Sequence, residues 1–327
     1  MIWASWRLQR LQLITLLGLV VAGAGAVFLV RSAMIDDLAA AGLTQCVTQA
    51  LNDCAAPGGT VKAFGQKWHN PLDIGRMAVF CAPALVGVFV GAPLFARELE
   101  QGTHVLAFTQ SVSRTRWMFS KLAIALVPAL AALVALQWLV SWWLGAAGTL
   151  GPRMNGAFNP INFGIDHVSP AAYALFAFAL GTFLGVLTRR TLVAMTAGLG
   201  VYVVARFAFS GVVDRLVTPQ RVEVTPDKQL SMYDDRSLVL TEGWLDAARQ
   251  PVPAERVQTV VQACKDAPGD SQEAFLQCLP QSGLATKYAT FIPQSQAWQV
   301  HLADLAVFGV LAVVLLAGTT WALRRQS

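Results

Sequence analysis

The stretch from Leu122 to Ala146, LAIALVPALAALVALQWLVSWWLGA, contains no charged residue and decides the class of fold. An apolar run of about 18 or more residues is long enough to cross a hydrocarbon core roughly 30 Å thick as a helix. The whole chain shares this character, since 55% of its 327 residues are hydrophobic and only 13% are charged. We therefore predict a membrane protein and exclude disordered, collagen-like and small disulfide-scaffold classes.

Six apolar runs predict an all-α polytopic membrane protein with six transmembrane helices. The predicted spans are residues 11–30, 77–96, 122–146, 171–188, 191–213 and 302–323. The first follows a basic segment that resembles the start of a signal peptide, but its apolar run exceeds the typical 7 to 15 residues. We interpret it as a retained anchor.

The distribution of basic residues predicts the orientation. With a cytoplasmic N-terminus, the inside segments contain only two acids, Glu98 and Glu100, against Arg7, Arg10, Arg97, Arg114, Arg116, Lys121, Arg189, Arg190, Arg324 and Arg325. This bias follows the positive-inside rule and predicts that both termini are cytoplasmic. The net charge of +5 thus reflects topology, and we expect no nucleic-acid partner.

The outside segments, about residues 31–76, 147–170 and 214–301, include one long enough for a small domain. The expected organisation is spans one to five in 1–213, an extracytoplasmic insertion domain in 214–301, and the sixth span with a cytoplasmic C-terminus in 302–327.

We expect the insertion domain to be mostly helical. Residues 221–225 alternate like a short strand, whereas Pro253 opens a helical pattern that includes Val257, Val260, Val261 and Cys264 on one face. Asp270 or Ser271 can cap a second helix with Ala274, Phe275 and Cys278 on its apolar face, which predicts a helical hairpin.

The cysteines predict disulfides outside the membrane. Cys46, Cys54, Cys264 and Cys278 all fall in outside segments, and Cys81 lies alone in the second span. A bridge between the last pair would staple the hairpin, while Cys46 and Cys54 need a turn, because a continuous helix would hold them roughly 12 Å apart. Four cysteines permit three pairings. A metal site is disfavoured because the four histidines are scattered and no CxxC or HExxH occurs.

Two ionisable residues and two glycine pairs stand out within the spans. Arg206 and Asp304 are candidates for a translocation path, because a charge in hydrocarbon usually faces a partner or a wet cavity; a structural ion pair or a snorkelling arginine is the alternative. Gly87 with Gly91, and Gly181 with Gly185, have the GxxxG spacing that permits close helix packing.

The sequence carries no catalytic signature. It contains neither GxxxxGK followed by Ser or Thr nor GxSxG, so we expect no ATPase motif and no enzyme activity in this chain.

The loop at residues 97–116 carries a resemblance to a known family. It reads Arg97-Glu98-x-Glu100-x-Gly102-Thr103, then an apolar turn, Thr109, and Ser113-Arg114 before the next span. A helix here would be amphipathic and suited to the inner membrane surface. Together with the six spans, the loop resembles the coupling region in permease subunits of bacterial type-2 ATP-binding-cassette (ABC) exporters, although Val112 stands where relatives often carry proline.

The resemblance implies a multi-pass permease of the bacterial cytoplasmic membrane that acts with a second permease, identical or different. A separate ABC ATPase subunit would bind ATP and Mg²⁺, no cofactor being bound by this chain. Arg97, Glu98, Glu100, Gly102, Thr103, Ser113 and Arg114 would then belong to a cytoplasmic, ATPase-facing coupling helix and its exit. The alternative is a membrane-anchored sensor or scaffold whose outside domain binds a ligand, motivated by the length of 214–301.

Overall fold

The computed structural model describes residues 2–48, 54, 59–102, 114–213, 216–226, 236–266 and 271–325. The chain forms two compact units, each described by itself below. The first contains Met1–Asn155, Asn159–Asp214 and Val300–Ser327, and the second contains Gly156–Phe158 and Arg215–Gln299.

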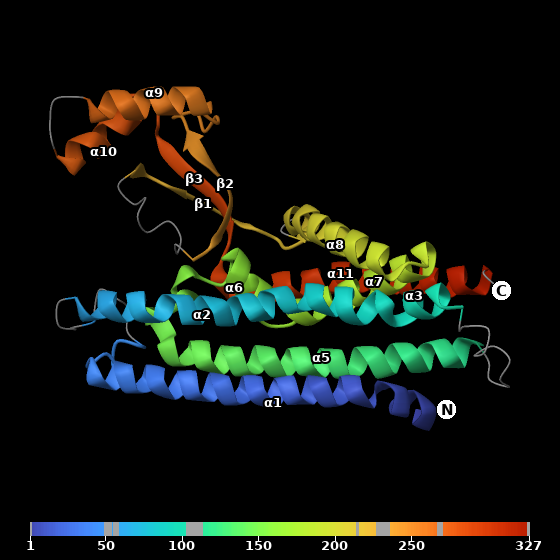
Figure 1. Ribbon diagram of the computed structural model, residues 1–327. Coiled ribbons are helices and arrows are strands. Elements are labelled where there is room, and N and C mark those ends of the chain that lie inside the picture. Colours follow the sequence, from blue (N-terminus) through green and yellow to red (C-terminus); the bar gives the residue numbers. More distant parts are fainter. Residues whose placement is uncertain are drawn as a thin grey trace. The chain divides into compact units, whose positions relative to one another are not determined.

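The first unit is helical (Figure 1). Its long elements are α1 (Ile2–Ala40), α2 (Thr60–Leu85), the π-helix η2 (Val86–Gly91), α3 (Pro93–Glu100), α5 (Arg114–Ala147), α7 (Ser169–Thr188), α8 (Thr191–Val213) and α11 (Ala297–Arg325). Between α5 and α7 lie η3 (Gly148–Leu150), η4 (Pro152–Asn155) and the short helix α6 (Pro160–Ile165).

The six predicted spans are confirmed as apolar helices long enough to cross a membrane. Within the described residues these stretches are Leu17–Ala40, Thr60–Glu100, Arg116–Leu150, Ser169–Thr188, Thr191–Phe209 and Gln294–Arg325. Most are longer than the predicted spans. Among them, α1 continues to Ala40 and α2 already begins at Thr60. The described residues of the segment 31–76, which we predicted to lie outside the membrane, are thus largely helical.

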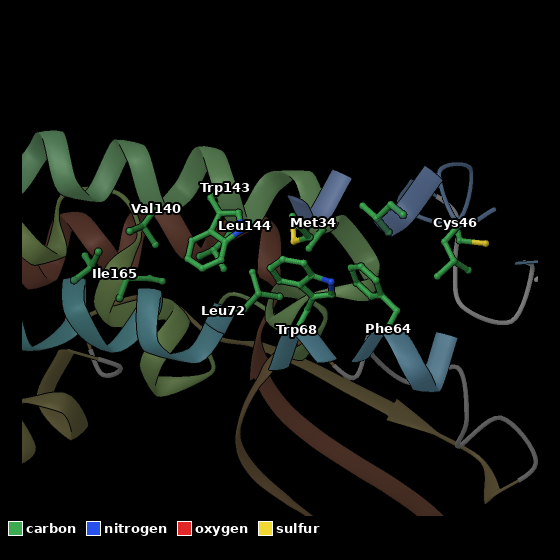
Figure 2. Packing of buried hydrophobic residues seen from close by; sticks show 13 residues of the cluster. Met34, Cys46, Phe64, Trp68, Leu72, Val140, Trp143, Leu144 and Ile165 are labelled. Carbon is green, nitrogen blue, oxygen red and sulfur yellow. The ribbon is translucent and has the colours of Figure 1, made fainter. Parts of the chain in front are cut away.

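Polar contacts hold the extended ends of α1 and α2 together. Asp37 accepts a hydrogen bond from the Trp68 indole (2.9 Å) and forms an ion pair with Lys67. Figure 2 shows the apolar cluster beside them, in which Met34 of α1 lies near Trp68 of α2 and Trp143 and Leu144 of α5. These contacts explain why the two helices do not stop where their apolar runs stop.

The predicted GxxxG pairs pack against each other at a single crossing of η2 with α7. A Cβ added to Gly181 would lie 2.4 Å from the Gly87 carbonyl oxygen, and one added to Gly91 would lie 2.6 Å from that of Phe178. Gly185 is equally close to Ala92. Backbone therefore touches backbone here, which only glycine permits.

The π-helix lies in this crossing and interrupts the long helix from Thr60 to Glu100. The amide of Ala92 reaches back to the carbonyl of Gly87 (2.9 Å), five residues earlier, and Pro93 follows without an amide hydrogen. The extra residue per turn rotates α3 relative to α2, and such bulges frequently mark functional positions.

The second unit contains more sheet than predicted. Strands β1 (Gln220–Val224), β2 (Leu238–Leu245) and β3 (Thr286–Ile292) form an antiparallel sheet with the order β1-β3-β2. Helices α9 (Ala254–Lys265) and α10 (Gln272–Gln281) form the predicted hairpin, and η6 (Gln294–Gln296) follows the sheet. The unit is therefore mixed α and β rather than mostly helical, because its central strand β3 pairs with segments more than forty residues earlier.

Two disulfides join the four cysteines predicted to pair. Cys46 and Cys54 lie 5.2 Å apart at their Cα atoms, which requires the turn that follows α1. Cys264 of α9 and Cys278 of α10 lie 5.7 Å apart and close the hairpin. Cys81 is the free cysteine among the described residues.

We expect Gly181→Ala to lower the free energy of unfolding by about 1–3 kcal/mol, because the methyl group would overlap the Gly87 carbonyl. Thermal unfolding in a mild detergent measures this as a lower Tm. Gly200→Ala is the matched control, since no atom lies within 4 Å of its added Cβ. Equal Tm values for the two variants would contradict a tight crossing.

Non-reducing peptide mapping is expected to find two linked peptide pairs, Cys46 with Cys54 and Cys264 with Cys278, and an alkylated Cys81. A peptide that links one cysteine of the first pair to one of the second would show a different framework.

Candidate functional site

The first candidate site lies at the C-terminal end of α3, where two glutamates contact two other helices. Glu98 forms an ion pair with Lys121 of α5, whose side chain is 13% exposed. Glu100 accepts hydrogen bonds from the Thr191 hydroxyl (2.8 Å) and backbone amide (3.2 Å). Because Thr191 begins α8, a carboxylate at this position also complements the positive end of that helix.

An apolar cluster fixes α3 beside these polar contacts. Phe95 is buried and packs with Met118 of α5, Phe178 of α7 and the ring of Trp117, 5.8 Å away centroid to centroid. Lys121 lies over the Trp117 ring at 4.5 Å. A movement of α3 would thus directly displace the residues of α5, α7 and α8 that it contacts.

Gly102 ends this element with a left-handed backbone (φ +69°). The amides of Gln101 and Gly102 bond to the carbonyls of Arg97 and Leu99, the pattern of a helix ending at glycine. Arg97 is exposed on the same helix. Of the remaining predicted coupling residues, Thr103 and Ser113 lie outside the described residues, and Arg114 is the first residue of α5.

A second candidate site lies at the opposite end of the spans, where α7 and α11 begin. We call Ser169, Tyr173, Arg206, His301 and Asp304 the polar cluster. The Arg206 guanidinium lies 3.9 Å from the Tyr173 ring centroid, and the phenol of Tyr173 interacts with Asp304 and Ser169. Arg206 and Asp304 are thus connected through Tyr173.

Arg206 is held largely by aromatic groups. Its guanidinium also lies 4.2 Å from the ring of Phe80 in α2 and donates a hydrogen bond to the Tyr202 hydroxyl (3.2 Å). A desolvated cation over aromatic faces gains about 2 kcal/mol per favourable contact, which offsets part of its burial cost. The structure therefore explains how α8 carries an arginine within its apolar sequence.

His301 is the most enclosed member of the polar cluster. It is 1% exposed, its Nδ1 lies 2.8 Å from the Ser169 hydroxyl, and its ring stacks on Phe163 of α6 at a centroid distance of 4.1 Å. Among the described residues, its Nε2 has no hydrogen-bond partner. An unsatisfied buried nitrogen is costly and calls for an explanation.

Helix α6 lies against this cluster and is anchored to α2. The buried Arg76 donates to the Asn162 side-chain oxygen (2.9 Å) and forms an ion pair with Asp73. Asn162 in turn donates to the Pro152 carbonyl (3.0 Å). Just after α6, burial raises the pKa of Asp166, although the nearby Arg153 acts in the opposite direction.

Sequence reasoning found Arg206 and Asp304 but missed Tyr173, Arg76, Asn162 and His301. Tyr173 is inconspicuous in an apolar helix, and Arg76 falls in a segment predicted to lie outside the membrane. One local signal was present for α6: Asn159 followed by Pro160 is a typical helix start, and the Asn159 side chain does cap the Ile161 and Asn162 amides.

Comparison with known proteins assigns the helical part of the chain to a family. The family described as "ABC-2 membrane transporter related" matches residues 17–213, which is more than half of the chain. The chain belongs to this family and is a membrane transport subunit of the ABC permease class. No curated protein and no solved structure matched it.

We expect Arg206→Gln to lower the free energy of unfolding by about 1–2 kcal/mol through loss of the contacts with Phe80 and Tyr173. Phe207→Leu, at a neighbouring position that is 77% exposed, is the matched control and should leave Tm unchanged. A Tm for Arg206→Gln at or above the native value would show that Arg206 is not held by these rings.

Proposed function

We propose that this permease is the membrane-spanning subunit of an exporter powered by a separate ABC ATPase, which docks beneath the loop at 97–116. The observation that carries the proposal is the pair of contacts from α3, Glu98 to Lys121 and Glu100 to Thr191. They join the segment next to the proposed docking loop to the third and fifth spans.

The glutamates then act as links within the permease, and the exposed residues near them, including Arg97, meet the ATPase. An ATPase that contacts the loop differently in its ATP-bound and free states biases two arrangements of the spans. The crossing of η2 with α7 supplies a fixed point about which α3 tilts. Gly102 permits the chain to turn from α3 into the loop.

The topology proposed for this transporter has both termini in the cytoplasm, so the α3 end of the spans faces the ATPase. The polar cluster and the second unit then lie on the extracytoplasmic side. ATP and Mg²⁺ bind to the partner ATPase, because the sequence has no P-loop of its own. A second permease subunit completes the transporter.

The polar cluster is proposed as the extracytoplasmic part of the path, with Arg206 and Asp304 facing passing cargo. The spans are otherwise largely apolar, which suits a lipid, a peptide or another amphipathic molecule. At the extracytoplasmic end of the path, the polar cluster would provide hydrogen-bonding groups that replace water around the polar part of such a cargo.

A charge exchange between Glu98 and Lys121 tests the link from α3 to α5. Glu98→Lys and Lys121→Glu each place like charges together, and each should reduce permease-dependent ATPase activity of the co-purified complex about threefold to tenfold. The double exchange recreates the pair and should recover most of the activity.

Arg256→Glu, a charge reversal on exposed α9, is the control and should not change this activity. The ATPase should co-purify with all four variants, because the pair lies within the permease. If no P-loop ATPase accompanies the native chain, the transporter proposal fails. If the double exchange is as inactive as the single variants, the Glu98–Lys121 contact does not transmit the motion.

A further inference from the structure

We infer that α6 is a movable plug, latched over the polar cluster, that must leave its place before cargo can exit. This inference takes its purpose from the proposed transport function, but the movement of α6 is measurable separately. It rests on three features of α6: which helices it touches, what it covers, and how short it is.

Three consecutive residues of α6 contact three different spans. Asn162 bonds to Arg76 of α2, and Phe163 stacks on His301 of α11. Gly164 leaves room for Arg206 of α8, whose guanidinium nitrogen would lie 2.3 Å from a Cβ at this position. Helix α6 therefore holds the ends of these spans together at one point.

The residues next to α6 are among the least exposed polar groups of the first unit. Ser169, His301 and Asp304 are 0%, 1% and 2% exposed. Phe163 covers one face of His301 with nearly parallel rings (6°). Removing α6 would expose this imidazole and the groups bonded to it, and would offer its Nε2 the hydrogen-bond partner that the described structure does not provide.

The construction of α6 favours movement. It has only six residues, and a helix this short is unstable without tertiary contacts. It is attached by the contacts of Asn162 with Arg76 and of Phe163 with His301, and by the buried side chain of Ile165 in the apolar cluster. These are side-chain contacts, unlike the backbone contact between η2 and α7. Closing α6 buries an imidazole nitrogen without a hydrogen-bond partner among the described residues, and opening relieves that cost, which offsets part of the contacts that are lost.

A buried thiol behind α6 reports its movement. In a Cys81→Ser background, Ser169→Cys places the thiol in the polar cluster, and the complex is reconstituted in lipid nanodiscs, where both faces are accessible. The probe is a membrane-impermeant maleimide, and the measurement is its labelling rate. The latch consists of two contacts, Arg76 with Asn162 and Phe163 with His301. With both contacts present we expect slow labelling, and with Arg76→Gln or Phe163→Ala we expect a labelling rate at least about tenfold higher.

Two controls separate release of the latch from general loosening. Ile161→Ala changes α6 without removing either latch contact and should label slowly. Met34→Cys, a fully buried reporter in α1, should stay unreactive when Arg76→Gln or Phe163→Ala is added. The inference is wrong if Ser169→Cys is labelled at the same rate with and without Arg76→Gln or Phe163→Ala. It is also wrong if these variants raise the labelling rate of Met34→Cys in parallel.

Addition of ATP distinguishes the plug from the transport proposal. If ATP accelerates labelling of Ser169→Cys with an active partner ATPase but not with an inactive one, the plug opens during transport. If the latch variants accelerate labelling and ATP does not, α6 is a movable cover, while coupling of its opening to an ATPase is wrong.

Discussion

The contact of the η2 backbone with the α7 backbone is the constraint on which the first unit depends. Apolar side chains gain little by leaving lipid for one another, so helices in a membrane associate through close packing. Here four glycines bring η2 and α7 to contact distance, and the elements that adjoin them in the chain carry polar residues. The separation fixed at the crossing therefore sets whether Glu100 reaches Thr191 at one end and Arg76 reaches Asn162 at the other.

The sequence predicted the spans well because hydropathy is a local property. Leu122 to Ala146 needs no partner to be recognised as a membrane helix, and the GxxxG pairs could be named as packing positions. Their mutual contact could not be predicted, since spacing within one helix does not identify the helix opposite. The early start of α2 was missed for a related reason: Lys62 and Lys67 suggest solvent, although Lys67 is paired with Asp37 on α1.

The residues of the two candidate sites likewise differ in whether local sequence identifies them. Arg206 and Asp304 are conspicuous in apolar sequence, whereas Tyr173, which connects them, becomes evident only when α7, α8 and α11 are in place. The same holds for β3, whose neighbours in the sheet come from distant parts of the chain. At the α3 end, the resemblance predicts a coupling segment, and the structure adds the partners of Glu98 and Glu100 inside the permease.

Only Arg189 and Arg190 separate α7 from α8, and Arg189 has a left-handed backbone (φ 53°) that reverses the chain. A connection this short leaves the two helices no freedom to enter the bilayer one after the other. On the insertion scale an arginine costs about 2.5–3.5 kcal/mol at the centre of a membrane helix, and Arg206 lies between the centre and the C-terminal end of α8. We therefore expect α7 and α8 to enter the lipid as one hairpin, in which Tyr173 lies against the arginine.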